Sequence, residues 1–337
     1  MTDPFDEFLR MAAELRSLRR STKTADLLYS KEAYEGHWSK VKDSITESIA
    51  AGEDLPTILS SLRPRPQMTR KSRSPAMLSI TKSLGFDVDG ARPTIRPTAV
   101  NGYFVPSANI EPMYEILKVA RESKYIVELG AGPGWNLLDL CIWLGRKIRE
   151  KVFYGLEYAS SGVETINFVS QSFNLPILGH QFNFMDPDIS YIPDNESALI
   201  FTHHSIEQVE NISKKLYDQI LERKSTTHVI HVEPIGWQRF PEIIDARKNN
   251  DEVFFQALNV KKNSLLDTSF AAAAFSALHS WKVHYNINAL SLIDEFKKHA
   301  NVHEIERVID FNHSYNANPF NASTYIRLRY DPVCSPP

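Results

Sequence analysis

The chain has little of what marks secreted, membrane-spanning or nucleic-acid-binding proteins. Only two of its 337 residues are cysteines, Cys141 and Cys334, so no disulfide framework is expected. The formal net charge of −3 gives no bulk attraction to nucleic acid or to a membrane surface. No apolar run approaches the length of a membrane span, and the acidic, amphipathic N-terminal segment lacks the apolar core of a signal peptide. We therefore expect a cytoplasmic protein without membrane contact.

The N-terminal third is expected to be a helical extension over residues 1–100. Apolar residues recur at helical spacing near the N-terminus and again from Tyr34 to Ile49, after which Gly52 ends the pattern. Near residues 63–75 the extension contains a linker with three prolines, five basic residues and no acid. The N-terminal helices are also the predicted site of a homodimer contact.

The most informative stretch runs from Tyr125 to Leu138, with the sequence YIVELGAGPGWNLL. A short apolar run predicts a strand, three glycines follow at every second position (Gly130, Gly132 and Gly134), and an apolar segment then predicts a helix. Glycines permit a sharp turn and a close approach of a ligand to the backbone. The helix that follows offers unpaired N–H groups at its start. This order is typical of a nucleotide-binding turn.

The glycine spacing distinguishes between nucleotide ligands. A dinucleotide fingerprint requires G-x-G-x-x-G, and here the third glycine comes one residue too early. The pattern Glu128-x-Gly130-x-Gly132-x-Gly134 instead resembles motif I of the class I S-adenosylmethionine (SAM) methyltransferases. The resemblance implies that SAM is the cofactor and that Glu128 holds its methionine part. It also implies that the turn, which includes Ala131, contacts the cofactor.

Downstream of this stretch, strand-like and helix-like segments alternate, which predicts a parallel, doubly wound α/β sheet with helices on both faces. Residues 101–333 are expected to form this domain, interrupted by an insertion near 234–287 that is too long for a plain connection. The chain ends in two strand-like segments, which resemble the terminal antiparallel hairpin of the methyltransferase fold. We therefore expect a mostly parallel, seven-stranded, Rossmann-like methyltransferase sheet, preceded by the helical extension.

Ligands of doubly wound sheets lie beyond the carboxyl ends of the strands, so polar residues at these ends are candidates for the site. Glu157 ends the second strand, where a carboxylate can accept both ribose hydroxyls. By resemblance, Asp186 after the third strand accepts the adenine amino group, with Asp188 as the alternative, and Met185 packs on the ring. The remaining residues assigned to the cofactor are Tyr158, Thr202 and His203.

Histidines gather at the predicted ends of the fourth and fifth strands. His203, His204, His231 and Glu233 stand there. Methylation of a hydroxyl needs a base for its proton, and the ordinary pKa of histidine suits this task near neutral pH. Side chains alternate along a strand, so His203 and His204 are expected to face different ways. We predict His204 as the base, followed by His203 and His231.

Some related O-methyltransferases carry a metal site of the form Glu-x-x-Glu-His after the fourth strand. Here His204, Glu207 and Gln208 stand at these three positions, and two of them depart from the pattern. Histidine and carboxylate also differ in their preference for hard divalent ions. We therefore expect no metal.

The acceptor is the least specified part of the prediction. After the fourth strand, the Asn/Asp-Pro-Pro-Tyr of amine methyltransferases is replaced by Thr202-His203-His204-Ser205. The segment from Ser205 and the helical extension resemble sugar and small-molecule O-methyltransferases. We therefore expect an enzyme of class EC 2.1.1 that methylates a hydroxyl of a small metabolite. The alternatives are an RNA or protein methyltransferase that docks through the basic linker, and a non-catalytic partner subunit. Nucleic acid is not the expected partner.

Overall fold

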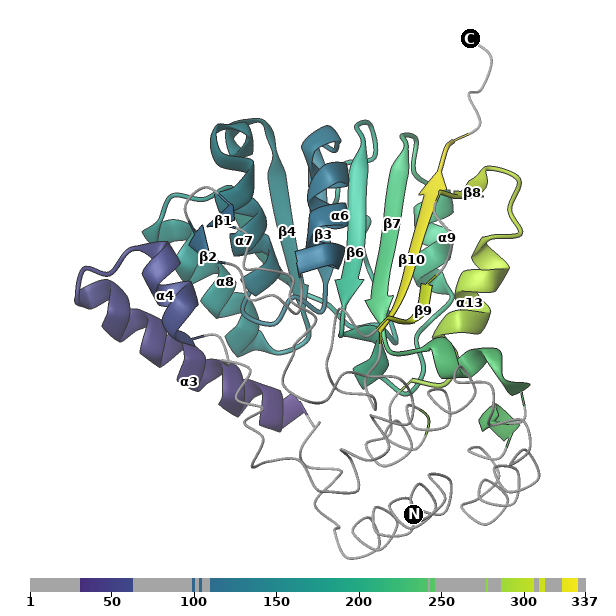
Figure 1. Cartoon of the computed structure of the whole chain (residues 1–337), viewed down its shortest axis with the longest axis horizontal. Coiled ribbons are helices and arrows are strands. Elements are labelled where there is room, and N and C mark those ends of the chain that lie inside the picture. Colours follow the sequence, from purple (N-terminus) through teal and green to yellow (C-terminus); the bar gives the residue numbers. More distant parts are fainter. Residues whose placement is uncertain are drawn as a thin grey trace, which may run out of the picture.

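The computed structural model describes residues 31–62, 99–100, 103–104, 110–241, 243–245, 277, 286–305, 309–312 and 323–332. They form one mixed sheet between two layers of helices (Figure 1). The basic linker near 63–75 and most of the insertion near 234–287 lie outside the described residues. Among the described helices, none combines the length and the apolar character that crossing a bilayer would demand.

The strands of the main sheet are β3 (Tyr125–Leu129), β4 (Val152–Glu157), β5 (Ile177–Gln181), β6 (Ala198–His203), β7 (Thr227–Glu233), β8 (Val302–Glu304), β9 (Ile309–Asn312) and β10 (Ser323–Tyr330). The helices are α3 (Lys31–Ala50), α4 (Leu55–Leu62), α6 (Ile110–Glu122), α7 (Trp135–Leu144), α8 (Ser160–Ser172), α9 (Lys215–Leu221) and α13 (Ala289–Phe296). Short 3-10 turns are η3 (Gly145–Glu150), η4 (Ile206–Gln208) and η5 (Gly236–Arg239), and a two-stranded ribbon joins β1 (Ala99–Val100) to β2 (Tyr103–Phe104).

The strand order of the sheet is β5-β4-β3-β6-β7-β10-β8. The first five strands in this order are mutually parallel, and β10 runs antiparallel to β7 and to β8. This is the topology of the class I methyltransferase fold, so the predicted fold class is confirmed. The terminal hairpin differs in one detail, because its first segment is divided into β8 and β9, which both pair with β10.

The two faces of the sheet bury different apolar clusters. Alternate residues of each strand point to opposite faces, so Ile126 of β3 packs under α6, α7 and α8, whereas Val127 packs on the side of α9 and α13. All five residues of β3 are buried, as expected for a central parallel strand that is covered on both faces. The site at the carboxyl ends therefore stands on a rigid base.

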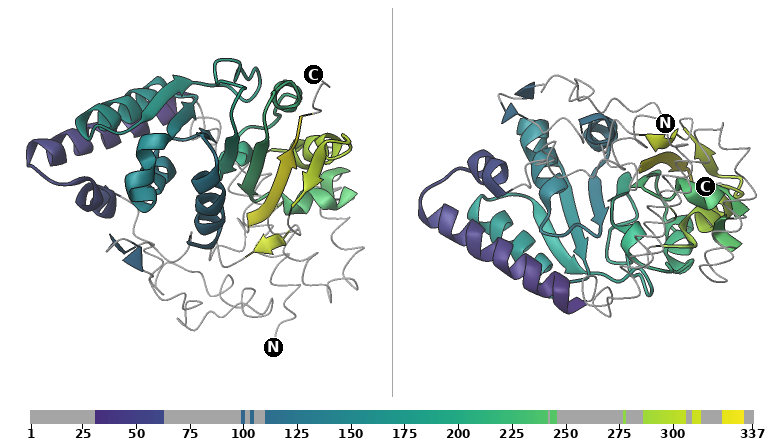
Figure 2. Two further views of the ribbon diagram at one scale, coloured as in Figure 1. Left: turned by 90° about the horizontal axis from the view of Figure 1, so that it is seen from above. Right: turned by 60° about the horizontal axis from the view of Figure 1, so that its bottom comes forward.

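The described part of the N-terminal extension packs on this same core. Helix α3 runs alongside α8 (Figure 2), and Gly52, with a φ of 80°, follows its end. Ile45 of α3 and Ile58 of α4 are almost fully buried in the cluster that also contains α7 and α8. The extension is thus attached to the α/β unit by apolar contacts.

One helix begins later than the sequence pattern indicates. The apolar pattern after β6 predicts a helix from about Gln208 to Arg223, but α9 begins at Lys215. The side chain of Asn288 accepts a hydrogen bond from the Ile212 N–H and donates one to the Ile212 carbonyl, at 3.0 and 2.9 Å. These bonds use the backbone groups that a helix would need.

Candidate functional site

The glycine turn joins β3 to α7 in a conformation that ordinary residues avoid. Gly130, Gly132 and Gly134 have φ angles of 72°, 54° and 85°, all in the left-handed region that favours glycine. Gly130 also approaches Ser205 closely, since a Cβ added to it would lie 2.4 Å from the Cβ of that serine. The spacing of the glycines therefore follows from alternate left-handed positions, and buried Ala131 fills the turn between them.

Glu128 is buried in β3 beneath this turn. Its side chain accepts a hydrogen bond from the Asn136 amide at 2.6 Å, and burial raises its pKa to about 8. The Oε2 atom is buried and has no hydrogen-bond partner among the described residues. Buried polar atoms normally have a partner, so an unpaired oxygen at a ligand edge indicates a place for a donor.

Glu157 ends β4 and holds the turn in place. Its carboxylate accepts hydrogen bonds from the Gly132 N–H at 2.8 Å and from the Ala159 N–H at 3.1 Å. Burial raises the pKa of Glu157, while these backbone donors act in the opposite direction. Each carboxylate oxygen has about two acceptor positions, so the group can accept further donors. The sequence predicted Glu157 at this edge but not its bond to Gly132.

The residues expected around the adenine ring are more exposed. Tyr158 is 42% exposed and Met185 is 62% exposed. Asp186 is also exposed and pairs with Lys215 at 2.8 Å, which directs its carboxylate to the start of α9. Asp188 accepts a bond from the Ser190 N–H at 2.9 Å, as in an Asx turn. The structure thus places these residues on the surface, with their acids already engaged.

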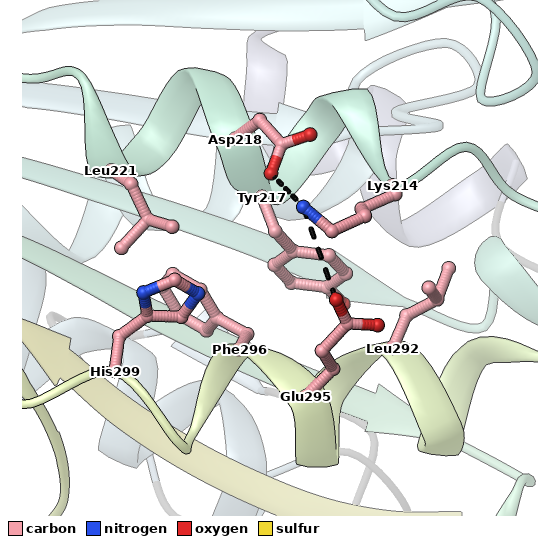
Figure 3. A pocket seen from close by; sticks show the side chains of 8 residues that line it. All are labelled: Lys214, Tyr217, Asp218, Leu221, Leu292, Glu295, Phe296 and His299. Atoms are coloured by element: carbon pink, nitrogen blue, oxygen red, sulfur yellow. Dashed lines mark hydrogen bonds and ion pairs between the residues drawn. The ribbon is translucent and has the colours of Figure 1, made fainter.

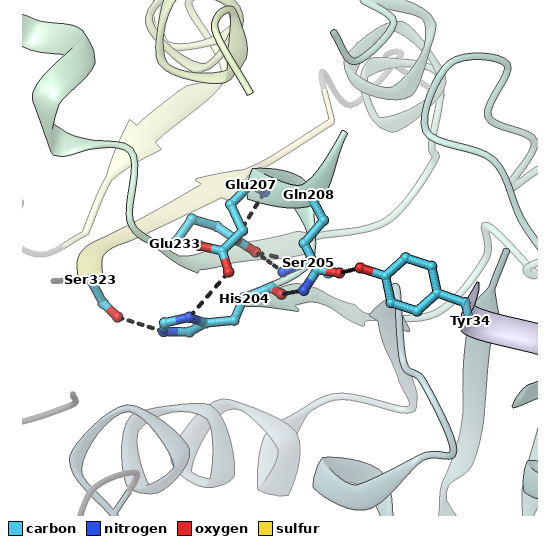
Figure 4. Close-up of polar contacts among 7 residues, drawn as sticks. All are labelled: Tyr34, His204, Ser205, Glu207, Gln208, Glu233 and Ser323. Carbon is cyan, nitrogen blue, oxygen red and sulfur yellow. Dashed lines mark hydrogen bonds and ion pairs between the residues drawn. The ribbon is translucent and has the colours of Figure 1, made fainter. Parts of the chain in front are cut away.

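A polar cluster follows β6 and β7 (Figure 4). His204 has a φ of 56°, which is uncommon for a residue other than glycine. Its Nε2 lies 2.7 Å from the Ser323 Oγ, and its Nδ1 lies 3.4 Å from the Glu207 Oε1. Glu233 accepts a hydrogen bond from the Ser205 N–H at 3.0 Å, which holds the start of this turn.

Two opposing effects set the proton affinity of His204. Burial acts to lower the pKa, but the carboxylates of Glu207 and Glu233 outweigh it and raise the pKa above the ordinary value. Burial and the neighbouring Glu207 charge raise the pKa of Glu233 to about 7. The His204 side chain is 20% exposed. An imidazole that is held by a carboxylate on one side is suited to take up a proton.

The three histidines predicted as candidate bases differ in their surroundings. The rings of His203 and His204 lie 5.1 Å apart, so the expectation that they face different ways is wrong. β6 ends at His203, and the left-handed backbone of His204 ends the alternation of side chains along the strand. His231 instead points into the core, where its Nδ1 bonds to Thr202 Oγ1 at 2.9 Å and its Nε2 to the Tyr217 hydroxyl at 3.1 Å. Burial lowers its pKa to about 3. Thr202 and His231 are both buried and bonded to each other, so the structure places them as core residues.

Several residues at this edge were missed by sequence reasoning. Ser323 comes from β10, more than a hundred positions after His204, and nothing in its local sequence indicated a role. Glu207 was considered only as a metal ligand. Within the part of the chain that the structure describes, no group of three or more histidine, cysteine or acidic side chains is arranged to hold a metal ion.

A separate small cavity lies between α9 and α13 (Figure 3). It is partly open to solvent and is bordered by an ion pair between Lys214 and Glu295 at 3.9 Å. Its lining residues are Lys214, Tyr217, Asp218, Leu221, Leu292, Glu295, Phe296 and His299. None of them belongs to the glycine turn or to the His204 cluster.

Comparisons with known proteins give structural likenesses only. No protein-family model matches the chain, and no curated protein matches it. An O-methyltransferase from Bacillus cereus in complex with SAH is 11% identical, with a TM-score of 0.38 over 82% of this chain and 96% of that one. A geranyl diphosphate C-methyltransferase from Streptomyces coelicolor A3(2) is 10% identical, with a TM-score of 0.38 over 66% and 79%. A SAM-dependent methyltransferase from Aquifex aeolicus is 11% identical, with a TM-score of 0.35 over 65% and 89%. All three TM-scores lie below 0.5.

Proposed function

We propose that the chain is a SAM-dependent methyltransferase of class EC 2.1.1 that methylates a hydroxyl group of a small metabolite. The observation that carries the proposal is the bond between Glu157 and the Gly132 N–H at the carboxyl edge of the sheet, at 2.8 Å. This bond joins Glu157, whose carboxylate can accept the hydroxyls of a ribose, to the glycine turn, whose backbone a ligand can approach closely. The buried Oε2 of Glu128, which has no hydrogen-bond partner among the described residues, lies at the same edge.

The residues present fit SAM. Glu157 retains acceptor capacity for the ribose hydroxyls, and the Glu128 carboxyl, once it has lost its proton, would accept from an ammonium group. When bound, SAM supplies an electrophilic methyl group. The glycine turn allows the backbone to approach such a ligand without side chains in between.

The His204 cluster supports a hydroxyl acceptor. Hydroxyl methylation requires the loss of one proton, and neutral His204 can receive it at Nε2, the atom that now bonds to Ser323. Glu207 is a positioning residue, since it stands on the Nδ1 side and stabilises the protonated ring. The absence of Asn-Pro-Pro-Tyr after β6 is consistent with oxygen chemistry.

Calorimetry with S-adenosylhomocysteine tests the cofactor assignment. The wild type should bind this ligand and should not bind NAD. Glu157→Ala should weaken binding at least tenfold, which is about 1.4 kcal/mol, because each hydrogen bond to a charged group contributes about 1.5–3 kcal/mol. Glu157→Gln keeps one carbonyl acceptor for the turn, so it separates a loss of charge from a distorted turn. Asp194→Asn, at an exposed pair with Lys224, is the matched control. An unchanged affinity in Glu157→Ala would refute the ribose assignment.

A second experiment tests the size of the acceptor. Deletion of residues 63–73 removes most of the basic linker. Turnover on a small hydroxylated acceptor should be unchanged if that acceptor is the substrate class. A selective loss of turnover on RNA or protein would instead support docking of a macromolecule through this linker.

A further inference from the structure

The N-terminal half of α3 lies across the carboxyl ends of the central strands. Its Glu35 carboxylate accepts hydrogen bonds from the Ser160 and Ser161 N–H groups at the start of α8, at 2.7 and 2.8 Å. The Trp38 ring packs on the glycine turn, because a Cβ added to Gly132 would lie 3.0 Å from its Cζ2. A helix of the extension therefore covers the turn to which we assign the cofactor.

Two further contacts extend along the same edge. The Lys31 ammonium lies 5.2 Å from the centre of the Tyr158 ring, over a residue assigned to the cofactor. The Tyr34 hydroxyl donates to the Gln208 side chain, whose amide donates to the His204 carbonyl at 2.7 Å (Figure 4). The helix thus reaches both the glycine turn and the turn that carries His204.

Trp38 and Glu157 border the same glycine of α8. A Cβ added to Gly162 would lie 2.6 Å from the Glu157 Cγ and 3.2 Å from the Trp38 Cδ1. Glu157 is only 6% exposed in this arrangement. A ligand cannot lie against Gly132 while the indole ring stays on it, since two groups cannot fill the same volume.

The two halves of α3 are held with different strength. Ile45, in the C-terminal half, is the only fully buried residue of the helix. The N-terminal half is held by the half-buried Trp38 and by polar contacts of Lys31, Tyr34 and Glu35. It has no side chain as deeply buried as Ile45, so we infer that it opens before the C-terminal half does.

Building on the proposed function, we propose that residues 31–40 of α3 are a lid over the cofactor site, closed in this structure by Trp38. Cofactor enters only after the indole leaves the glycine turn. The binding-competent state is then a minor fraction of the molecules, and the apparent affinity is reduced by that fraction. Removing the indole raises the fraction.

Stopped-flow fluorescence with S-adenosylhomocysteine tests the lid. Trp135, which follows the glycine turn directly, serves as the reporter in all variants. Trp38→Ala should raise the association rate constant at least tenfold. Glu35→Gln, which leaves the indole in place but weakens the tie to α8, should raise it less. Lys42→Ala removes an exposed ion pair with Glu164 further along the same helix and should change nothing. An unchanged or lower rate in Trp38→Ala would overturn the proposal and make Trp38 a wall of the site.

Hydrogen exchange of the ligand-free protein separates the lid from the proposed function. Amides of residues 31–40 should exchange faster than those of residues 41–50, and equal protection of the two halves would also overturn the lid. Binding of S-adenosylhomocysteine to Trp38→Ala but not to the wild type would support it strongly. If S-adenosylhomocysteine binds neither the wild type nor any variant, the cofactor assignment is wrong. The lid proposal then falls with it, even if the two halves of α3 exchange their amide hydrogens at different rates.

Discussion

The core position of His231 leads to a prediction about acid stability that needs no substrate. Burial lowers the pKa of His231 from its ordinary 6.5 to about 3. In the unfolded chain the ring takes up a proton below about pH 6.5, whereas in the folded protein it stays neutral. The contribution of His231 is therefore fully present above pH 6.5 and is lost as the pH falls. At pH 5 the loss is about 2 kcal/mol, from about 1.5 pH units at about 1.4 kcal/mol each.

The variant His231→Asn isolates this effect. Asparagine carries no titratable group, so its stability lacks the contribution of this ring. At pH 7 the variant should be less stable by about 1–3 kcal/mol, because the Tyr217 hydroxyl loses its partner in the core. The gap between wild type and variant should shrink by about 2 kcal/mol at pH 5. The difference between the two proteins is the measured quantity, because buried Glu128 and Glu233 have raised pKa values and give the opposite trend in both.

Urea unfolding at pH 7, 6 and 5, followed by circular dichroism, measures the gap. A change of 2 kcal/mol corresponds to roughly 1 M in the unfolding midpoint for an m-value of about 2 kcal/mol/M. A gap that stays constant between pH 7 and pH 5 would show that His231 titrates normally in the folded protein. In that case the ring would be accessible, and its exclusion from the set of candidate bases would be wrong.

Three other changes test the site directly. Gly132→Val should abolish binding of S-adenosylhomocysteine in calorimetry, because a φ of 54° strains a branched residue and its side chain would stand in the path of the ligand. Normal affinity would show that the glycine turn is not part of the cofactor site. His204→Ala should lower turnover by about 10²–10⁴ while S-adenosylhomocysteine still binds, whereas a loss with EDTA that Mg²⁺ restores would make His204 a metal ligand. Between pH 5 and pH 8, Glu128→Gln should lose less free energy of unfolding than the wild type, by about 4 kcal/mol at most. The raised pKa of Glu128 contributes stability to the wild type that disappears as the pH rises to about 8. An equal pH dependence of the two proteins in urea unfolding would contradict a buried, protonated Glu128.

The local sequence was sufficient to predict the helices and strands of the sheet domain and the polar residues at the ends of the strands. Alternating strand and helix patterns predicted the parallel sheet, and Glu128 and Glu157 were predicted at strand ends, where the structure has them. These features are local, because an apolar run and the residue that ends it depend on neighbouring positions. The glycine turn is local too, since three left-handed positions accept little besides glycine.

Tertiary structure alone decided which side chains face the site. His203, His204 and His231 look alike in sequence, yet His231 is sealed in the core by Tyr217 from α9. Ser323 reaches His204 only because β10 pairs beside β7, where Thr324 stands opposite Glu233. The proposed lid likewise depends on how α3 packs alongside α8, which brings Trp38 onto Gly132. Such contacts join residues far apart in the chain, so no local pattern encodes them, and packing of whole elements determines which meet.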